Sequence, residues 1–266
     1  TGQPILLWGE VGSGKSLFAQ SIHNTSPCAR GPFVTFDCAA READQRALLA
    51  QAGRAADGGT LYLDNLEHLT QGGQRVLCRL LREGVVHLPE EAAPTPSAVR
   101  VIASTTGDLA RLVEEGAFQA ELYYLLIPLR LALPPLRTRP EDLNQAIDMC
   151  LDDCVVKFKR YVVLTKEARK RLNDYSWPGN YIQLRAFLER MVLTAPSRTV
   201  NASYVMGLLQ ELYPVSTARS EGAQAQELPD SEGARLAEVL SRNGGNRAAA
   251  AAELGISKTT LWRRMK

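Results

Sequence analysis

Residues 9–16 read GEVGSGKS and fit the pattern of a glycine, four variable residues, and then Gly, Lys and Ser. The apolar, β-rich run Ile5 to Trp8 precedes this stretch, and a helical pattern over Lys15 to Asn24 follows it. A strand, a glycine-rich turn and a helix in this order form the setting in which such a stretch wraps phosphates. The segment therefore predicts a P-loop, with a chance glycine turn as the alternative.

The P-loop predicts a phosphate ligand of the ATP or ADP type, bound together with Mg²⁺. Lys15 is expected to reach the β- and γ-phosphates, and Ser16 to offer its hydroxyl to the metal. The backbone of the whole loop is expected to surround the phosphates. The predicted nucleotide-binding residues of the loop are Gly9, Glu10, Val11, Gly12, Ser13, Gly14, Lys15 and Ser16.

A carboxylate ends the later apolar run Thr60 to Asp64. Asp64 is the expected metal-side partner of the P-loop and should hold Mg²⁺ directly or through water. A hydrolytic ATPase of this layout normally carries a second carboxylate at the next position, but Asn65 stands there and cannot take a proton. Glu67 is a conceivable substitute, although a solvated acid at a helix start is the favoured interpretation of that residue.

Short β-rich runs alternate with helical stretches in residues 1–133, which predicts an α/β fold with a parallel sheet. The expected strands are Ile5 to Trp8, Phe33 to Asp37, Thr60 to Asp64, Val99 to Thr105 and Leu126 to Leu133. The expected helices are Lys15 to Asn24, Gln71 to Glu83 and Thr106 to Glu115.

Only helical periodicity follows in residues 134–213, which predicts a small helical lid. Its expected helices are Leu143 to Tyr161, Thr165 to Tyr175, Tyr181 to Leu193 and Asn201 to Leu212. Residues 214–230 lack periodic apolar positions and are interpreted as a linker, and a last unit spans 231–266.

The last unit is basic. Residues 231–266 hold seven basic side chains and three acidic ones, a net charge of +4, which leaves −2 for the rest of a chain whose total is +2. Two short helical patterns joined by Gly255, Ile256 and Ser257 predict a small all-α helix-turn-helix domain. A helical hairpin with a solvated basic helix is the alternative. The expected contacts to double-stranded DNA are Asn246, Arg247, Ser257, Lys258, Thr259, Thr260, Arg263 and Arg264.

Composition narrows the class of protein. A hydrophobic fraction of 45% without a long apolar run predicts no membrane insertion. Five cysteines without CxxC spacing argue against a zinc site and a disulfide framework, so reduced thiols in the cytoplasm are expected. The chain begins at Thr1 without a leader-like segment and is expected to be a fragment.

With these motifs in place, the chain resembles the AAA+ domain and the Fis-type DNA-binding domain of bacterial enhancer-binding proteins, which activate sigma-54 RNA polymerase. The resemblance covers nearly the whole chain and implies RNA polymerase as a partner and self-association as a dimer or larger oligomer. Beyond GEVGSGKS it rests on GGTLYLDN (58–65), VRVIASTT (99–106), FQAELYYLL (118–126), LPPLRTRPEDL (133–143), WPGN (177–180) and AAAAELGISKTTLWRRMK (249–266).

Departures from the family pattern imply a degenerate subgroup. The family's GAFTGA loop, which contacts sigma-54, is missing from the short stretch between residues 37 and 58. The family's arginine fingers fall at Gln119 and Leu125, and its sensor arginine falls at Ile182, with Arg185 a turn away. An arginine acting in trans supplies ~10³ or more in rate, so hydrolysis is expected to be weak.

Three interpretations follow. The favoured one is a DNA-binding transcription regulator whose AAA+ domain binds nucleotide but hydrolyses it poorly or not at all. The second is an active ATPase that remodels RNA polymerase, with Glu67 or a neighbouring subunit supplying the missing groups. The third is an interaction protein in which the P-loop is a relic and only DNA binding remains.

Overall fold

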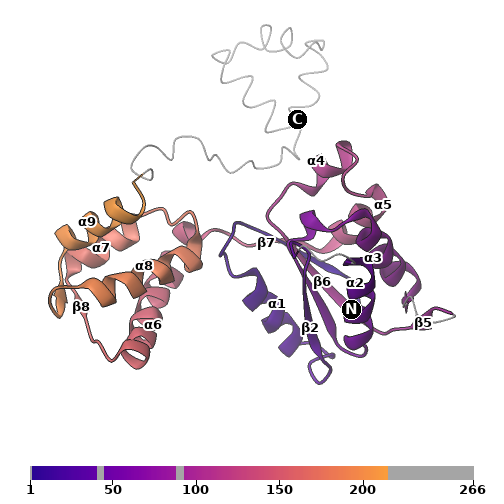
Figure 1. The fold of residues 1–266 in the computed structure, drawn as a ribbon, viewed down its shortest axis with the longest axis horizontal. Helices are drawn as coiled ribbons and strands as arrows, with labels where there is room; N and C mark the ends of the chain where they lie inside the picture. The colour runs from indigo at the N-terminus through magenta and orange to yellow at the C-terminus, as the bar shows by residue number, and fades with distance from the viewer. Residues whose placement is uncertain (1, 41–44, 88–92, 215–266) are drawn as a thin grey trace, which may run out of the picture. The chain divides into compact units, whose positions relative to one another are not determined.

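The computed structural model describes residues 2–40, 45–87 and 93–214. Within them, five strands form one parallel sheet in the order β2-β3-β6-β1-β7 (Figure 1). These strands are β1 (Ile5–Trp8), β2 (Phe33–Asp37), β3 (Thr60–Asp64), β6 (Arg100–Thr105) and β7 (Arg130–Ala132). The α/β fold class expected from the alternating pattern is confirmed.

Helices cover both faces of this sheet. α1 lies on one face, and α2 and α3 lie on the other (Figure 1). The helices of this part are α1 (Lys15–Asn24), α2 (Gln45–Ala55), α3 (Gln71–Glu83), α4 (Leu109–Glu114) and α5 (Ala120–Leu126), with 3₁₀ turns η1 (Leu66–His68) and η2 (Ile127–Leu129). A short antiparallel pair, β4 (Val85–Val86) and β5 (Thr95–Pro96), follows α3.

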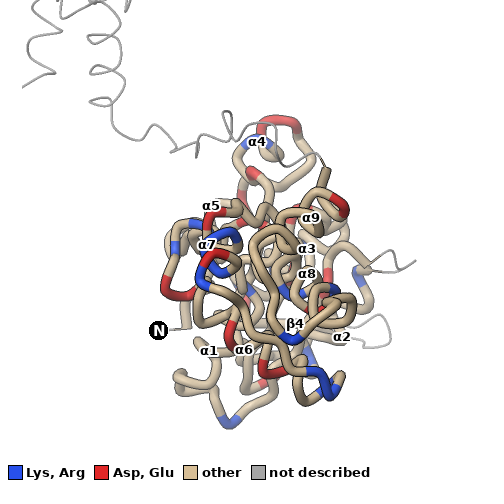
Figure 2. The backbone as a smooth tube through the Cα atoms, turned by 90° about the vertical axis from the view of Figure 1, so that its left-hand side faces the viewer, with Lys and Arg blue, Asp and Glu red and all other residues tan. Residues whose placement is uncertain are grey.

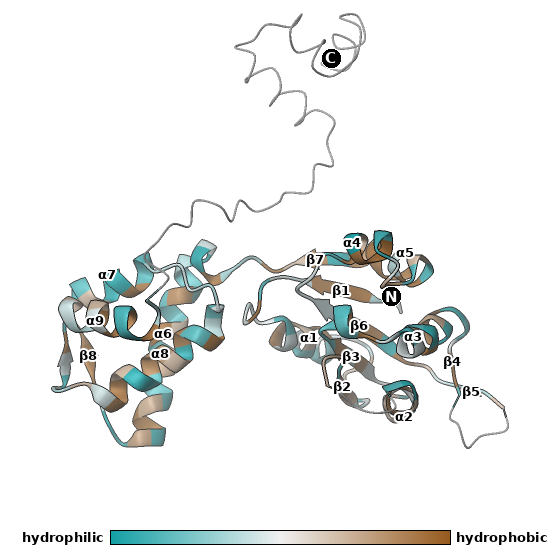
Figure 3. Cartoon of the chain, turned by 45° about the horizontal axis from the view of Figure 1, so that its top comes forward, coloured by the Kyte–Doolittle hydropathy of each residue, from teal (hydrophilic) through white to brown (hydrophobic). Residues whose placement is uncertain are grey.

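The period-2 alternation of strand side chains divides the core between the two faces. Leu61 and Leu63 of β3 pack with helix residues such as Leu77 of α3, whereas Tyr62 faces α1. Figure 3 shows mostly hydrophobic strands flanked by helices in which hydrophilic and hydrophobic residues alternate. The carboxyl ends of β1, β2, β3 and β6 therefore meet at one edge, where a ligand site is expected in an open parallel sheet.

One predicted strand is wrong in its first half. Leu126 ends helix α5 and Ile127–Leu129 forms η2, so only Arg130–Ala132 of the expected run from Leu126 to Leu133 is β-strand. The run is apolar at most positions, and such a run does not by itself distinguish a buried helix end from a strand. The helices α2 and α5 were not predicted.

The helical part that follows comprises η3 (Leu136–Thr138), α6 (Pro140–Phe158), α7 (Lys166–Asp174), α8 (Asn180–Thr194) and α9 (Ala202–Leu212), with β8 (Val163–Leu164) paired to β9 (Thr199–Val200). Trp177 is fully buried before α8, and its Nε1 donates to the Leu172 carbonyl at 2.8 Å. Thr165 caps α7, because its hydroxyl accepts from the Ala168 N–H. Residues Thr1–Leu209 form one compact unit.

Two surface properties of the described residues bear on function. None of their helices is long and apolar enough to cross a membrane. Figure 2 shows acidic and basic residues interspersed along the backbone of the described part.

Candidate nucleotide site

The P-loop connects β1 to α1 at the carboxyl edge of the sheet. Gly12 and Gly14 adopt φ of 72° and 95°, a region that glycine occupies without the strain other residues incur. A Cβ at Gly9 would lie 2.8 Å from the Leu133 carbonyl oxygen, so the turn also needs glycine for close packing. The two fixed glycines of the motif, Gly9 and Gly14, and the additional Gly12 thus each have a steric reason.

The amides of the loop are available to a ligand. The backbone N–H groups of Gly12, Gly14, Lys15 and Ser16 have no hydrogen-bond partner among the described residues. The carbonyls, by contrast, are used, since Gly12 O accepts from Tyr181 N at 3.1 Å and Ser13 O from Arg139 at 3.1 Å. Ser13 Oγ is buried without a partner in this part of the chain. The loop therefore offers unpaired N–H donors at the start of a helix, while its carbonyl acceptors are already hydrogen-bonded. This arrangement suits an anionic phosphate.

Lys15 lies inside the loop. Its Nζ donates to the carbonyls of Gly9 and Glu10, both at 3.0 Å, which leaves one of its three donors unassigned. Burial lowers the pKa of Lys15 below its ordinary value, while the negative charges of Asp64 and Glu67 act in the opposite direction. The ammonium and both carboxylates therefore share one electrostatic site.

Asp64 ends β3 beside the P-loop and is held on one oxygen. Its Oδ1 accepts from Tyr62 Oη at 3.1 Å, from Ser104 Oγ and from Asn65 N at 3.1 Å. Asp64 Oδ2 has no hydrogen-bond partner among the described residues, so an oxygen remains for a cation or its water. Ser16, the other expected Mg²⁺ ligand, is exposed at the start of α1. The Tyr62 and Ser104 contacts were not predicted.

The surroundings of Glu67 differ from those expected for a solvated acid at a helix start. It is half-buried in η1, and its Oε1 accepts from Thr106 N at 3.1 Å and Thr106 Oγ1 at 2.6 Å. Burial raises the pKa of Glu67, but these hydrogen bonds outweigh it and the pKa lies below its ordinary value. Its Oε2 is buried without a partner in the described part. A solvated helix-start acid is therefore wrong, because the tight turn after β3 brings Glu67 against the end of β6.

Asn65 and the residues at the family's arginine positions carry no charge. Asn65 has φ of 56°, and its Nδ2 donates to Asp37 Oδ1 at 3.0 Å. Gln119 precedes α5, where its backbone N–H donates to Gln74 Oε1 at 2.8 Å, and Ile182 is 62% exposed on α8. No arginine occupies these positions.

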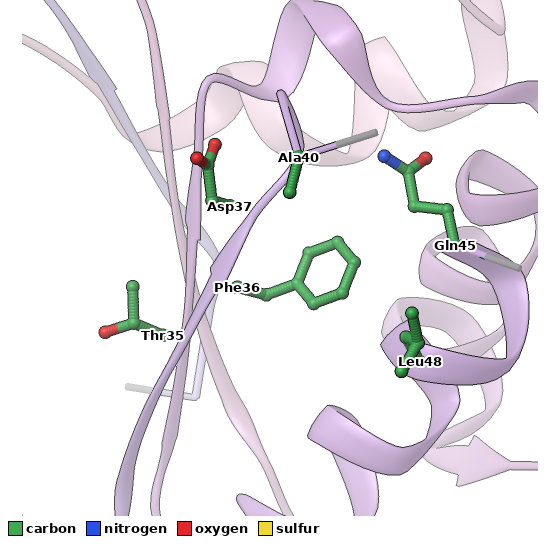
Figure 4. A pocket seen from close by; sticks show the side chains of 6 residues that line it. All are labelled: Thr35, Phe36, Asp37, Ala40, Gln45 and Leu48. Carbon is green, nitrogen blue, oxygen red and sulfur yellow. The ribbon is translucent and has the colours of Figure 1, made fainter. Parts of the chain in front are cut away.

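A pocket of 270 Å³ lies between the end of β2 and the start of α2, beside the nucleotide edge. Figure 4 shows Phe36 pointing from β2 towards Leu48 of α2, while the Asp37 carboxylate points away from that ring. Both polar groups of the Gln45 side chain are hydrogen-bonded within the protein: its amide donates to Cys38 O at 2.8 Å, and its oxygen accepts from Thr70 N at 2.7 Å. Asp37 also lines this pocket, and its Oδ1 accepts the hydrogen bond from Asn65 Nδ2.

The lid holds the P-loop from the other side, an arrangement that sequence reasoning missed. Arg137 pairs with both carboxylate oxygens of Glu10, at 2.6 and 2.8 Å. Asn180 is fully buried, and its Nδ2 donates to Val11 O at 2.9 Å and Glu10 Oε2 at 3.1 Å. The WPGN motif, which ends in Asn180, was the available signal for this contact.

The predicted DNA contacts lie outside the described residues. They are Asn246, Arg247, Ser257, Lys258, Thr259, Thr260, Arg263 and Arg264.

Three families match consecutive parts of the chain. Residues 1–136 match the family described as "Sigma-54 interaction domain", residues 137–221 an AAA+ ATPase lid domain, and residues 227–266 the family "Bacterial regulatory protein, Fis family".

Curated relatives are transcription regulators. The PTS-dependent dihydroxyacetone kinase operon regulatory protein of Escherichia coli K12 is 31% identical over 99% of this chain and 43% of its own length. The Nif-specific regulatory protein of Klebsiella pneumoniae is 33% identical over 95% of this chain and 52% of its own length. The chain thus spans about half the length of the curated relatives it matches.

Solved structures agree with these matches. Brucella abortus NtrX in complex with ADP has a TM-score of 0.70 and 26% identity, covering 100% of this chain and 63% of that chain. The same protein in complex with ATP gives a TM-score of 0.69. Taken with the match over residues 1–136, these findings show that the chain belongs to the sigma-54 interaction domain family.

Proposed function

We propose that this chain is the nucleotide-binding and DNA-binding part of a bacterial transcription regulator that binds ATP or ADP with Mg²⁺ and hydrolyses ATP weakly or not at all. One observation supports both halves of the proposal. Unpartnered backbone amides beside Lys15 would bind phosphate, whereas the side chain of Asn65, where a hydrolytic carboxylate is expected, is an amide that donates to Asp37.

The binding half rests on the donors of the P-loop. The amides of Gly12, Gly14, Lys15 and Ser16 would bind the phosphates, and the Lys15 ammonium would exchange a carbonyl partner for a phosphate oxygen. Asp64 Oδ2 and Ser16 would hold Mg²⁺, which supplies neutralisation of phosphate charge when bound. NtrX was crystallised with ADP and with ATP, which favours the same ligands here.

The hydrolysis half rests on missing charges. A water attacking the γ-phosphate must lose a proton, and the amide of Asn65 cannot accept one. Gln119, Leu125 and Ile182 cannot stabilise the charge that develops on the transferred phosphoryl group. Nucleotide would then act as a ligand that stabilises the conformation to which it binds.

The assignment as a DNA-binding regulator rests on the C-terminal match to the Fis family over residues 227–266. We infer that this segment binds double-stranded DNA, and that RNA polymerase is the protein partner. Contact with sigma-54 is expected to be defective, because the stretch between β2 and β3 carries α2 and no GAFTGA sequence.

Calorimetry with ATP and with ADP, each with Mg²⁺, tests the binding half. We expect saturable binding of both nucleotides, at least tenfold weaker in Lys15→Ala and unchanged in Lys166→Ala, which removes an exposed lysine of α7. Absence of binding to either nucleotide would favour the interpretation in which the P-loop is a relic. Arg263→Ala with Arg264→Ala should weaken DNA binding and flatten its salt dependence, and unchanged binding would reject the assigned recognition helix.

An active ATPase is the second candidate, and Glu67 favours it. This carboxylate contributes to the field at Lys15 and is oriented by Thr106. If Glu67 serves as the base, turnover should be readily measurable in the native protein and lost in Glu67→Gln. Our proposal expects no measurable steady turnover to lose.

A further inference from the structure

A second pocket of 270 Å³ lies between α2, α3 and the end of β4, and it shares no lining residue with the P-loop. Its lining residues are mostly cationic, together with two valines. The lining residues are Arg46, Arg75, Val76, Arg79, Val85 and His87. Such a volume is below the usual 300–1,000 Å³ of drug-sized ligand sites, so the pocket suits a small group.

Two adjacent helices bring the arginines together. Arg75 and Arg79 lie one turn apart on α3 and therefore on the same helix face. Arg46 joins them from α2, since its side-chain carbons lie 3.5 and 3.9 Å from the Cβ position at Gly72, in the first turn of α3. This proximity leaves three guanidinium groups around one pocket.

Among the described residues, Glu83 is the one carboxylate that pairs with an arginine of the pocket. Arg79 lies 3.8 Å from Glu83 on the same helix, and that exposed pair is weak. Arg46 and Arg75 have no carboxylate partner among the described residues, whereas Arg82, also on α3, pairs with Glu121. Like charges one turn apart on a helix repel each other, so the cluster is not explained by the stability of α3.

His87 adds an unsatisfied polar atom to the same pocket. Its Nδ1 is buried and has no hydrogen-bond partner in the part of the chain that the structure describes. Most buried polar atoms in proteins are hydrogen-bonded, and His87 Nδ1, when it carries a proton, can donate to an anionic group in this pocket.

We propose that this pocket binds a phosphate group of the DNA backbone, as a second DNA contact in addition to the Fis-type segment. The inference rests on the DNA binding proposed above. Guanidinium groups match the oxygens of phosphate in paired hydrogen bonds, and the small pocket accommodates one such group. DNA is favoured over an acidic protein because the same chain carries a Fis-family match, so DNA is already expected to be near it.

Salt-dependent DNA binding by the whole chain tests the proposal. Each phosphate contact contributes about 0.9 to the slope of log K against log salt. We expect Arg75→Ala with Arg79→Ala to weaken binding roughly three- to tenfold and to reduce the slope by about one, the loss of one phosphate contact. The control is Arg30→Ala with Arg111→Ala, which removes the same charge from exposed positions elsewhere. Arg75→Lys with Arg79→Lys should retain most of the slope.

Further arms separate the possible outcomes. Pocket and control variants that behave alike would overturn the proposal. If the pocket variant binds a polyglutamate peptide more weakly than the native protein does, but binds DNA equally well, the pocket is a site for an acidic protein. If inorganic phosphate binds the native protein, and the pocket variant binds DNA as tightly as the native protein does, the pocket is a site for the free phosphate ion. Failure of Arg263→Ala with Arg264→Ala to weaken DNA binding would instead count against the proposed function.

Discussion

The side-chain amide of Asn65 donates to the carboxylate of Asp37 at 3.0 Å, across the carboxyl ends of two neighbouring parallel strands. The same Asp37 oxygen also accepts from the Ala39 N–H at 2.9 Å. Asn65 is therefore held in place beside Asp64, where a hydrolytic base would be expected, but it presents an amide. This contact orders the edge of the site without providing a proton acceptor.

Restoring charge at two positions should restore hydrolysis. Asn65→Glu supplies a proton acceptor and Gln119→Arg supplies a cation, and the double variant is expected to raise ATP turnover at least about 100-fold. Gln119 donates to Gln74 through its backbone, so that contact survives the change. Phosphate release would be followed at several protein concentrations, because the arginine is expected to act between subunits. Turnover that stays at the native level would contradict this reading of the two positions, and Asn65→Gln with Gln119→Arg is the matched control.

Asn180→Ala should loosen the P-loop. The substitution removes the partners of the Leu136 N–H, at 2.7 Å, and of the Val11 carbonyl, at 2.9 Å. Leaving two such groups unsatisfied costs about 2–4 kcal/mol, which lowers the Tm by roughly 5–10 °C in a unit of this size. Thermal unfolding with and without ADP measures this loss, and ADP affinity should fall as well. A loss no larger than that of Asn24→Ala, at an exposed asparagine of α1, would show that the lid contact contributes little.

Acid should remove the stabilisation provided by Glu10. The hydrogen bond from Arg137 lowers the pKa of Glu10 below its ordinary value of 4.5, against an opposing effect of burial, and Asn180 lowers it further. A depressed folded-state pKa contributes stability above the unfolded value, and this contribution is lost as the pH falls through the folded value. The Tm difference between the native protein and Glu10→Gln should therefore be constant near neutral pH and shrink below about pH 4.5. Glu141→Gln, at an exposed carboxylate of α6, should show no such trend, and a difference that grows in acid would refute the assignment.

Local sequence patterns predicted much of the fold. β1, β2 and β3 and helices α1 and α3 begin and end where their periodicity and flanking residues indicated. Helix α2 was missed because alanines at residues 47, 50, 52 and 55 give weak apolar contrast, although alanine is a strong helix former. The end of α5 was mistaken for strand because its apolar residues continue into β7 without a polar break.

The candidate site was predictable only where the motif is local. The fixed P-loop positions and Asp64 followed from spacing and from the strand that precedes each. Asn180 contacts Val11 across 169 residues, and Glu67 reaches Thr106 across 39, so no local period reports either contact. Such contacts depend on how the sheet and the lid are packed, which the periodicity of single elements does not specify.

The central claim is that the chain has kept its nucleotide and lost efficient hydrolysis. The most direct test is to measure ATP binding by calorimetry and steady-state phosphate release on the same preparation, with Lys15→Ala as the control for contaminating ATPase. We predict saturable ATP binding together with phosphate release no greater than that of Lys15→Ala. Steady release that is well above this control and disappears in Lys15→Ala would contradict the account.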